Sequence, residues 1–319
     1  MRSSTRGVKK AVVAVALGSI AVLAAACSSN SSTSTTTTAA PATTTTTAPP
    51  IPTTVIPTQV ANSTIAASVP SSVKSKGTLV VAMDATYPPN EFVAPDGTTI
   101  VGMDADLANA LAQTMGLKAQ LTNATFDTII PGIVAGKYGM GASSFTDTLA
   151  RQKVVDFVDY FSAGESFYVK AGSPTTFNGL ASLCGHSVAV ESGTTEQTDA
   201  TTQAAKCKAT GKGSVTVLTF NTQSEANLAV SSGRADAGFA DSPVAAYIVA
   251  TSNGVFQNSG APFNLAPYGL ALPKGNGMAA PVKNAVNLLI SNGVYNQILT
   301  KWGVQAGAIP TATINGATS

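Results

Sequence analysis

The stretch SSFTDTLAR, residues 143–151, places four hydroxyl side chains and one permanent cation directly after a short apolar segment, 140–142. That segment reads as the end of a buried strand. The planar guanidinium of arginine binds a carboxylate through two parallel, charge-assisted hydrogen bonds, and hydroxyl groups replace water around such an anion. The stretch therefore predicts a carboxylate-binding floor formed by Arg151 with Ser143, Ser144 and Thr146.

Other polar and aromatic residues follow further predicted strands at the same point. The strands 78–84, 118–125, 187–191 and 235–241 end in or lead into such residues, and Gly193 offers backbone N–H groups to an anion. In open parallel sheets, ligands bind outside the carboxyl ends of the strands. We therefore expect one ligand site formed by Asp84, Tyr87, Phe126, Ser143, Ser144, Thr146, Arg151, Glu191, Thr195 and Asp241.

A free amino acid matches this set of groups. Its carboxylate fits the guanidinium of Arg151, and its ammonium group needs acceptors, which Asp241 supplies. Tyr87 and Phe126 offer aromatic faces to the ligand side chain. The residues thus favour a zwitterionic ligand.

Each of these residues also has an ordinary structural interpretation. Arg151 is equally suited to pair with Asp147 or Asp156, and Asp241 stands where a helix cap is common. The serines can terminate a strand, Tyr87 can pack in a Pro-Pro turn, and Glu191 can be solvated. The stronger argument for a site is that all of them lie at strand ends.

Strand and helix patterns alternate twice along the chain. Asp104 is suited to cap a helix with apolar residues at 107, 111 and 115, and Pro131 lies early in a second helix, 126–137. A second strand–helix series begins at 187. The alternation predicts an α/β protein with parallel strands and two lobes.

The N-terminus has the form of an export signal. Arg2, Arg6, Lys9 and Lys10 precede an apolar run that ends in Ala-Ala-Ala before Cys27. This is similar to a bacterial lipobox, so residues 1–27 are expected to be a lipoprotein signal peptide with Cys27 as the lipidated residue. Residues 28–72 are mostly Ser, Thr, Ala and Pro, which predicts a disordered tether.

Composition excludes some classes of function. Without the four cations of the signal peptide, 14 basic residues face 16 acidic ones, which argues against nucleic-acid binding. Cys184 and Cys207, in an exported chain, favour a disulfide. His186 is the only histidine, so no metal site and no cofactor is expected.

The chain from about 75 to 303 resembles the amino-acid-binding proteins of ABC uptake systems, solute-binding family 3 of the polar amino-acid type. The matching stretches are GTLVVAMDATYPPNEF, VGMDADLANALA, FDTIIPGIVAGK, the SSxTxTxxR run, ESGTT, SGRADAGFAD and GVYNQILTKWG. The resemblance implies two Rossmann-like lobes joined by a two-strand hinge, the periplasmic-binding-protein type II fold. Lobe 1 would span 73–165 with 265–319, and lobe 2 would span 166–264.

The resemblance also implies function. Arg151 would bind the ligand carboxylate, Asp241 the ammonium group and Asp84 the ligand side chain, and Glu191 beside Asp84 favours a cationic or hydrogen-bonding side chain such as that of lysine or arginine. The protein would be a monomer, anchored to the outer face of the cell membrane, that closes on a free amino acid and delivers it to an ABC permease. The alternatives are a sensor lipoprotein and an enzyme on the same fold, such as a cyclic-acid dehydratase.

Overall fold

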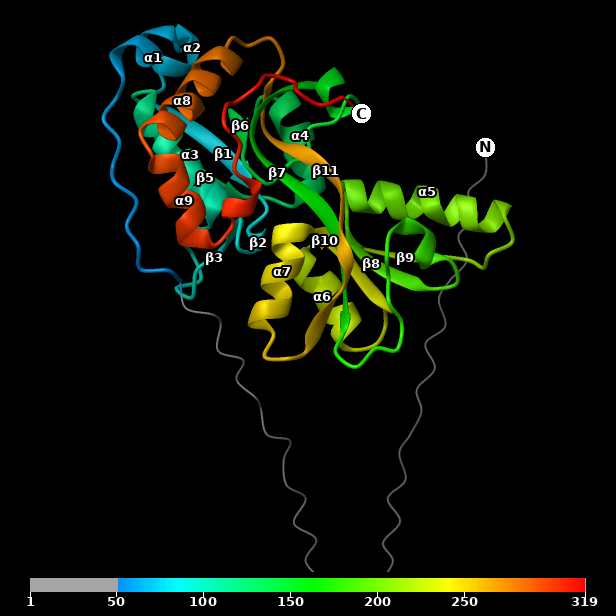
Figure 1. Ribbon diagram of the computed structural model, residues 1–319. Coiled ribbons are helices and arrows are strands. Elements are labelled where there is room, and N and C mark those ends of the chain that lie inside the picture. Colours follow the sequence, from blue (N-terminus) through cyan, green and yellow to red (C-terminus); the bar gives the residue numbers. More distant parts are fainter. Residues whose placement is uncertain (1–50, 319) are drawn as a thin grey trace, which may run out of the picture. The chain divides into compact units, whose positions relative to one another are not determined.

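The computed structural model describes residues 51–318, and an eight-stranded mixed sheet runs through them (Figure 1). The strand order is β5-β1-β6-β11-β7-β10-β8-β9. The strands are β1 (Thr78–Met83), β5 (Lys118–Asn123), β6 (Met140–Gly141), β7 (Val155–Lys170), β8 (Ser187–Glu191), β9 (Thr216–Phe220), β10 (Ala237–Asp241) and β11 (Phe256–Pro273).

The two long central strands connect the two ends of this sheet. β7 and β11 pair antiparallel along most of their length and run side by side between the two groups of elements in Figure 1. At one end β1 pairs in parallel with β5 and β6, and at the other β8 pairs in parallel with β9 and β10. This is the expected two-lobed α/β fold with a two-strand connection. We keep the names lobe 1 for residues 73–165 and 265–318, and lobe 2 for residues 166–264.

In lobe 1, helices cover both faces of the sheet, and successive side chains of β1 point alternately to the two faces. Val81 and Met83 pack with α3 (Met103–Thr114), α8 (Ala279–Ser291) and α9 (Val294–Trp302). Ala82, which points to the opposite face, packs with Ile129 and Ile133 of α4 (Phe126–Val134). This period of two is typical of a strand buried on both sides.

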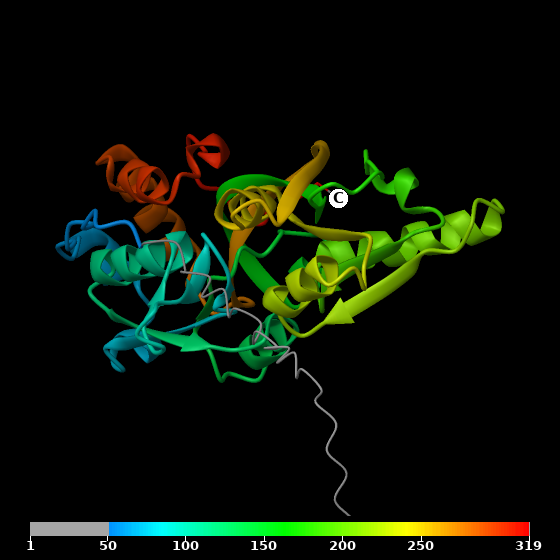
Figure 2. The same cartoon turned by 90° about the horizontal axis from the view of Figure 1, so that it is seen from below.

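Lobe 2 repeats this construction. Val188 and Val190 of β8 pack in the core beneath α5 (Thr195–Ala209), whereas Ala189 faces α6 (Gln223–Ser231) and α7 (Ser242–Thr251). Figure 2 shows the helices of this lobe on the two sides of its strands. Parallel strands therefore bring their carboxyl ends to one edge in each lobe.

Short elements complete the fold. A three-stranded sheet consists of β2 (Thr86–Tyr87), β3 (Glu91–Val93) and β4 (Ile100–Val101). Three 3-10 turns are η1 (Arg151–Lys153), η2 (Leu180–Leu183) and η3 (Gln305–Gly307). The predicted disulfide is confirmed: Cys184 and Cys207 are bonded and tie the end of η2 to α5.

The predicted tether is too long at its C-terminal end. Residues 63–68 form α1 (Ser63–Ser68) and residues 71–74 form α2 (Ser71–Lys74), and the side chains of Ile65 and Val69 are buried in the core of lobe 1. The backbone N–H of Asn62 donates to the carbonyl of Thr114 at 2.9 Å. A few aliphatic residues among the Ser and Thr are enough to dock this segment. Cys27, the signal peptide and the rest of the tether lie outside the described residues.

One helix start is also different from the expectation. α3 begins after Gly102, and Asp104 lies inside the helix as a buried acceptor for Ser144 N at 2.7 Å and Tyr160 OH at 2.6 Å. The carboxylate therefore holds the loop that contains Ser144 against β7 rather than capping the helix. Among the described residues, no helix combines the length and apolar character that a membrane span needs.

Candidate functional site

A pocket with an empty volume of about 280 Å³ lies at the edge where the strands of both lobes end. All ten residues predicted from the sequence line it, together with Glu91, Thr194 and Glu196. Lobe 1 contributes Asp84, Tyr87, Glu91, Phe126, Ser143, Ser144, Thr146 and Arg151, and lobe 2 contributes Glu191, Thr194, Thr195, Glu196 and Asp241. The structure thus brings the predicted residues together.

The two lobes contact each other around this pocket. Tyr87 OH donates to Asp241 Oδ2 at 2.9 Å, and Ser192 Oγ donates to Asp127 Oδ2 at 3.2 Å. The hydroxyls of Thr146 and Thr195 lie 3.3 Å apart. Hydrogen bonds that join residues of different lobes at the pocket rim describe a closed arrangement.

Arg151 lies at the floor of the pocket between backbone carbonyls and aromatic rings. Its Nη1 donates to Thr146 O at 2.7 Å, and its Nη2 donates to Gly193 O at 2.9 Å. The guanidinium carbon lies 5.4 Å from the ring centre of Phe126 and 5.5 Å from that of Phe145. Within the described residues no carboxylate forms an ion pair with it, so pairing with Asp147 or Asp156 does not occur.

Burial affects the charge of Arg151. Desolvation lowers the pKa of its guanidinium, while the carboxylates of Glu196 and Asp241 raise that pKa again. The guanidinium remains a cation because arginine side chains are not deprotonated in proteins. Arg151 is half-buried and has no ion-pair partner among the described residues, so its guanidinium is a suitable position for an anionic group.

Asp84 and Glu191 form an acidic pair across the two lobes. Asp84 Oδ2 accepts from Phe126 N at 2.9 Å, and its Oδ1 accepts from Thr86 Oγ1 at 2.7 Å. Glu191 Oε1 is buried and has no hydrogen-bond partner. Burial, followed by the neighbouring Asp84, raises the pKa of Glu191 well above its usual value. The pair therefore offers buried carboxyl oxygens from both lobes, and one of them, Glu191 Oε1, lacks a donor.

Asp241 and Glu196 form a second acidic pair in lobe 2. Although Asp241 precedes α7, its side chain makes no helix-cap bond and accepts from Tyr87 OH instead. Burial, followed by the charge of Glu196, raises the pKa of Asp241 well above its usual value. Glu196 is 2% exposed, and its Oε1 is also without a partner.

The hydroxyls of Ser143 and Ser144 are occupied within lobe 1. Ser143 Oγ donates to Glu91 Oε1 at 2.7 Å and accepts from Asp84 N at 2.8 Å. Ser144 Oγ accepts from Asn90 Nδ2 at 2.8 Å. Both serines line the pocket and also hold neighbouring residues in place. Their structural role is therefore present, and their contact with a ligand stays a prediction.

The turn at Gly193 differs from the expectation that its N–H group is free to bind an anion. The N–H of Gly193 donates to Gln197 Oε1 at 2.8 Å, so it is not available to an anion. Its carbonyl, instead, receives Arg151. Thr194 caps α5 by accepting from Gln197 N at 3.1 Å. The turn thus positions the guanidinium, and the N–H of Gly193 is occupied by Gln197.

Three lining residues are missing from the sequence prediction. Glu91 follows a short turn, and burial together with the carboxylate of Asp104 raises its pKa well above the usual value. Thr194 and Glu196 begin a helix, where a hydroxyl and an acid are expected for capping and the helix dipole. Their position at the exit of β8 is the one signal that points to a site.

Comparison with known families decides the class of this protein. Residues 79–305 match the family of bacterial extracellular solute-binding proteins, family 3. The chain belongs to this family. The resemblance seen in the sequence motifs and the expected fold are therefore confirmed.

Individual relatives are binding proteins. The chain is 35% identical to the arginine-binding protein ArgT of Corynebacterium glutamicum, over 79% of this chain and 82% of that protein. It is 32% identical to the ABC transporter glutamine-binding protein GlnH of Bacillus subtilis, over 65% of this chain and 74% of that protein. A solved structure of an ancestral arginine-binding protein bound to arginine has a TM-score of 0.66 and 35% identity, and covers 71% of this chain and 98% of that one.

Within the described part of the chain, no three or more His, Cys, Asp or Glu side chains are grouped as metal ligands would be. Five carboxyl side chains and one guanidinium line the pocket.

Proposed function

We propose that this protein captures a free amino acid with a cationic side chain, arginine first, and delivers it to an ABC permease. One observation carries the proposal: the closed pocket sets a single cation, Arg151, against an excess of carboxyl groups, of which Glu191 and Glu196 each leave a buried oxygen unpartnered. Buried acceptors without donors are destabilising. A ligand rich in N–H groups would satisfy them.

Each end of such a ligand has a position in the pocket. The carboxylate would lie at Arg151 and the ammonium group at Asp241 beside Glu196. A guanidinium or ammonium side chain would lie between Asp84 and Glu191, whose facing carboxyl groups come from different lobes. Because the ligand would contact both lobes, binding would favour the closed arrangement.

Relatives support this proposal, since they are named as arginine-binding and glutamine-binding proteins of transport systems. The protein would act outside the cytoplasmic membrane as a monomer, held to the outer face of the cell membrane by a lipid on Cys27. The permease and its ATPase would be separate chains. Mass spectrometry of the membrane fraction would test the lipid, because a diacylated Cys27 peptide is expected there.

A thermal-shift screen of the twenty amino acids, followed by calorimetry, tests the ligand. We expect L-arginine and L-lysine to raise the melting temperature more than L-glutamine does. Acidic amino acids should raise it least. A preference for an acidic amino acid, or no response to any amino acid, would contradict the proposal.

Arg151→Ala tests the carboxylate position. Removing a buried charged hydrogen-bond donor costs about 2–5 kcal/mol, so we expect affinity for L-arginine to fall at least thirtyfold while circular dichroism stays unchanged. Arg234→Ala, on the α6 side of lobe 2 and outside the pocket, serves as the control. Unchanged affinity of the Arg151 variant would remove this residue from the account.

An enzyme is the second candidate, and the raised pKa of Glu191 favours it, because a protonated carboxyl group can act as a general acid. Incubation of cyclic hydroxy acids with the purified protein, followed by product analysis, separates the two. We expect the acids to be recovered unchanged, and a dehydrated product would decide for catalysis.

A further inference from the structure

The C-terminal segment 312–317 lies along the beginning of β7, beyond the residues that match the family. Ile314 forms an antiparallel bridge with Val158. Asp159 N donates to Thr313 O at 2.9 Å, and Asn315 N donates to Phe157 O at 3.1 Å. Since β10 pairs with β7 only from Glu165 onward, the segment covers an edge of β7 that has no other strand partner in the described fold.

The same segment donates to two buried carboxylates. Asp159 Oδ2 accepts from Thr313 Oγ1 at 2.5 Å and from Gly316 N at 3.0 Å. Asp147 Oδ2 accepts from Ala317 N at 3.1 Å. A side chain at position 316 would collide with the side chains of Asp159 and Thr313, so only glycine lets the backbone lie this close to them. The segment thus reaches past β7 to a second element.

That second element is the loop that carries the ligand site. Asp147 lies between Thr146 and Arg151, both of which line the pocket. The two carboxylate oxygens of Asp147 accept from Gln152 Nε2 at 2.9 and 3.0 Å, and Asp147 N donates to Pro267 O at 2.9 Å. Asp147 is therefore the point where the loop, β11 and the C-terminal segment meet.

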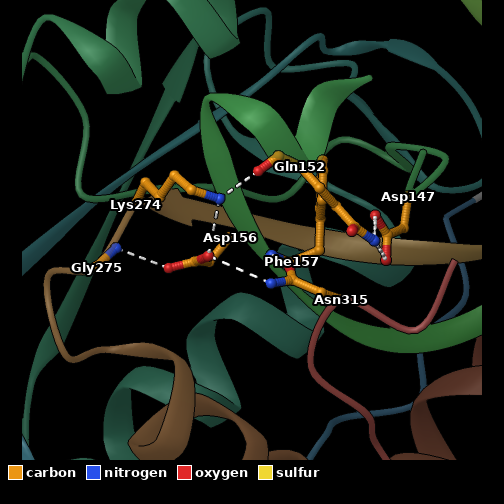
Figure 3. Close-up of polar contacts among 7 residues, drawn as sticks. All are labelled: Asp147, Gln152, Asp156, Phe157, Lys274, Gly275 and Asn315. Carbon is orange, nitrogen blue, oxygen red and sulfur yellow. Dashed lines mark hydrogen bonds and ion pairs between the residues drawn. The ribbon is translucent and has the colours of Figure 1, made fainter. Parts of the chain in front are cut away.

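Figure 3 shows how the other side of Gln152 is held. Lys274 contacts both the carbonyl of Gln152 and the carboxylate of Asp156, and Asn315 lies between Asp156 and Phe157. Asn315 Oδ1 accepts from Phe157 N at 2.7 Å, and its Nδ2 donates to Asp156 Oδ1 at 3.3 Å. The residue that follows Arg151 is thus fixed on two sides, and the C-terminal segment takes part in both.

We propose that the segment 312–317 is a positioning element of the ligand site, which fixes the loop 143–151 through Asp147 and so sets where Arg151 meets the ligand carboxylate. This inference rests on the proposed binding of an amino acid at Arg151. Bidentate binding of a carboxylate depends on the placement of the guanidinium, and a displacement of about 1 Å weakens it strongly.

Ala317→Pro in the full chain tests the proposal, because proline removes the N–H that donates to Asp147 and leaves the rest of the segment in place. We expect the dissociation constant for L-arginine, measured by calorimetry well below the melting temperature, to rise about tenfold, in line with loss of one hydrogen bond to a charged group. Amide hydrogen exchange at Arg151 and Gln152, which donate to Thr148, should become faster.

Thr311→Ala is the matched control. Its hydroxyl donates to Asn287 Oδ1 of α8 at 3.2 Å and does not reach the loop, so affinity and loop exchange should stay at wild-type values. Asn315→Ala, which removes the contacts with Asp156 and Phe157, serves as the second variant should Ala317→Pro fail to fold. It should change both measurements in the same direction.

The outcomes separate this proposal from the proposed function. Wild-type affinity in a folded variant, or weaker binding without faster exchange at 151 and 152, would overturn the positioning role and point to a purely structural tail. Failure of the wild type to bind L-arginine would instead count against the proposed ligand. Loop exchange would then still decide whether the segment holds the loop, since unchanged exchange in the variants would refute it.

Discussion

Glu191 and Glu196 each bury a carboxylate oxygen that no donor within the described chain satisfies. Both side chains are about 2% exposed, and burial raises the pKa of both carboxyl groups. Natural interiors rarely retain such oxygens without a reason. The two glutamates therefore indicate that the pocket is shaped for a partner that brings its own N–H groups.

Glu191→Gln tests this at the level of a single residue. We expect affinity for L-arginine to fall about ten- to a hundredfold, since hydrogen bonds to charged groups contribute about 1.5–3 kcal/mol, whereas affinity for L-glutamine should change little. Glu225→Gln, on the exposed side of α6, is the control variant. Equal losses for the two ligands would remove Glu191 from the specificity account.

The sequence predicts ten lining residues because strand ends are visible as local patterns and parallel strands share one edge. Glu196 is not predictable in this way. It occupies the first turn of α5, where an acid is ordinarily explained by the helix dipole, and its burial is a feature of the folded pocket. Arg151 binding the carbonyl of Gly193 is likewise a relation between lobes that no local pattern contains.

At the scale of elements, the turn between β8 and α5 limits how closely the lobes approach. Gly193 has φ +80°, and a Cβ there would lie 2.8 Å from the Cβ of Asp127 in α4 of the other lobe. Glycine therefore serves two purposes at this position: it adopts the left-handed conformation, and it leaves room for closure.

Gly193→Ala should weaken binding of L-arginine about tenfold, because the added methyl group strains the closed form and a 1.4 kcal/mol penalty is a factor of ten. Gly172→Ala is a matched control, since Gly172 also has φ +80° but no atom within 4 Å of its Cβ position. Both variants should lose similar stability in urea titrations. Equal affinities of the two variants would contradict a role of Gly193 in closure.

Element boundaries illustrate what sequence patterns leave open. The strands β1, β5, β8 and β10 and the helices α3 and α4 are recognised from the sequence by short apolar runs and by apolar spacings such as that of residues 107, 111 and 115. Residues 51–74 are not, since their composition resembles that of the tether while a few aliphatic side chains dock them on lobe 1. The packing of these aliphatic side chains orders the segment despite its tether-like composition. The sequence alone does not show which of the two effects is larger.

For the molecule as a whole, a cluster of acids beside the strand connection links stability to pH. Glu165 on β7 is 5% exposed, and burial, with the charges of Glu196 and Asp199, raises its pKa to about 9. Asn264 on β11 donates to both Glu165 and Asp199, at 2.9 and 3.1 Å. A proton is therefore held between the two long strands and α5.

Glu165→Gln tests this linkage. The folded chain holds the proton up to about pH 9, whereas the unfolded chain releases it near 4.5, so the free energy of unfolding should fall as pH rises between these values. The variant should lack this part of the slope and be more stable at pH 7.5 by roughly 1–3 kcal/mol. Urea titrations from pH 5 to 9 measure it, and parallel curves for variant and wild type would contradict it.

The docked segment 51–69 has a consequence for motion. It is tied to α3 and packs in the core of lobe 1 alone, so any force that reaches the chain from upstream of residue 51 is transmitted to lobe 1. We therefore expect lobe 1 to keep a constant orientation while lobe 2 rotates about β7 and β11 when the protein opens. A partner that recognises the closed form would then meet lobe 1 in a constant orientation. Only the position of lobe 2 would distinguish the closed form from the open form.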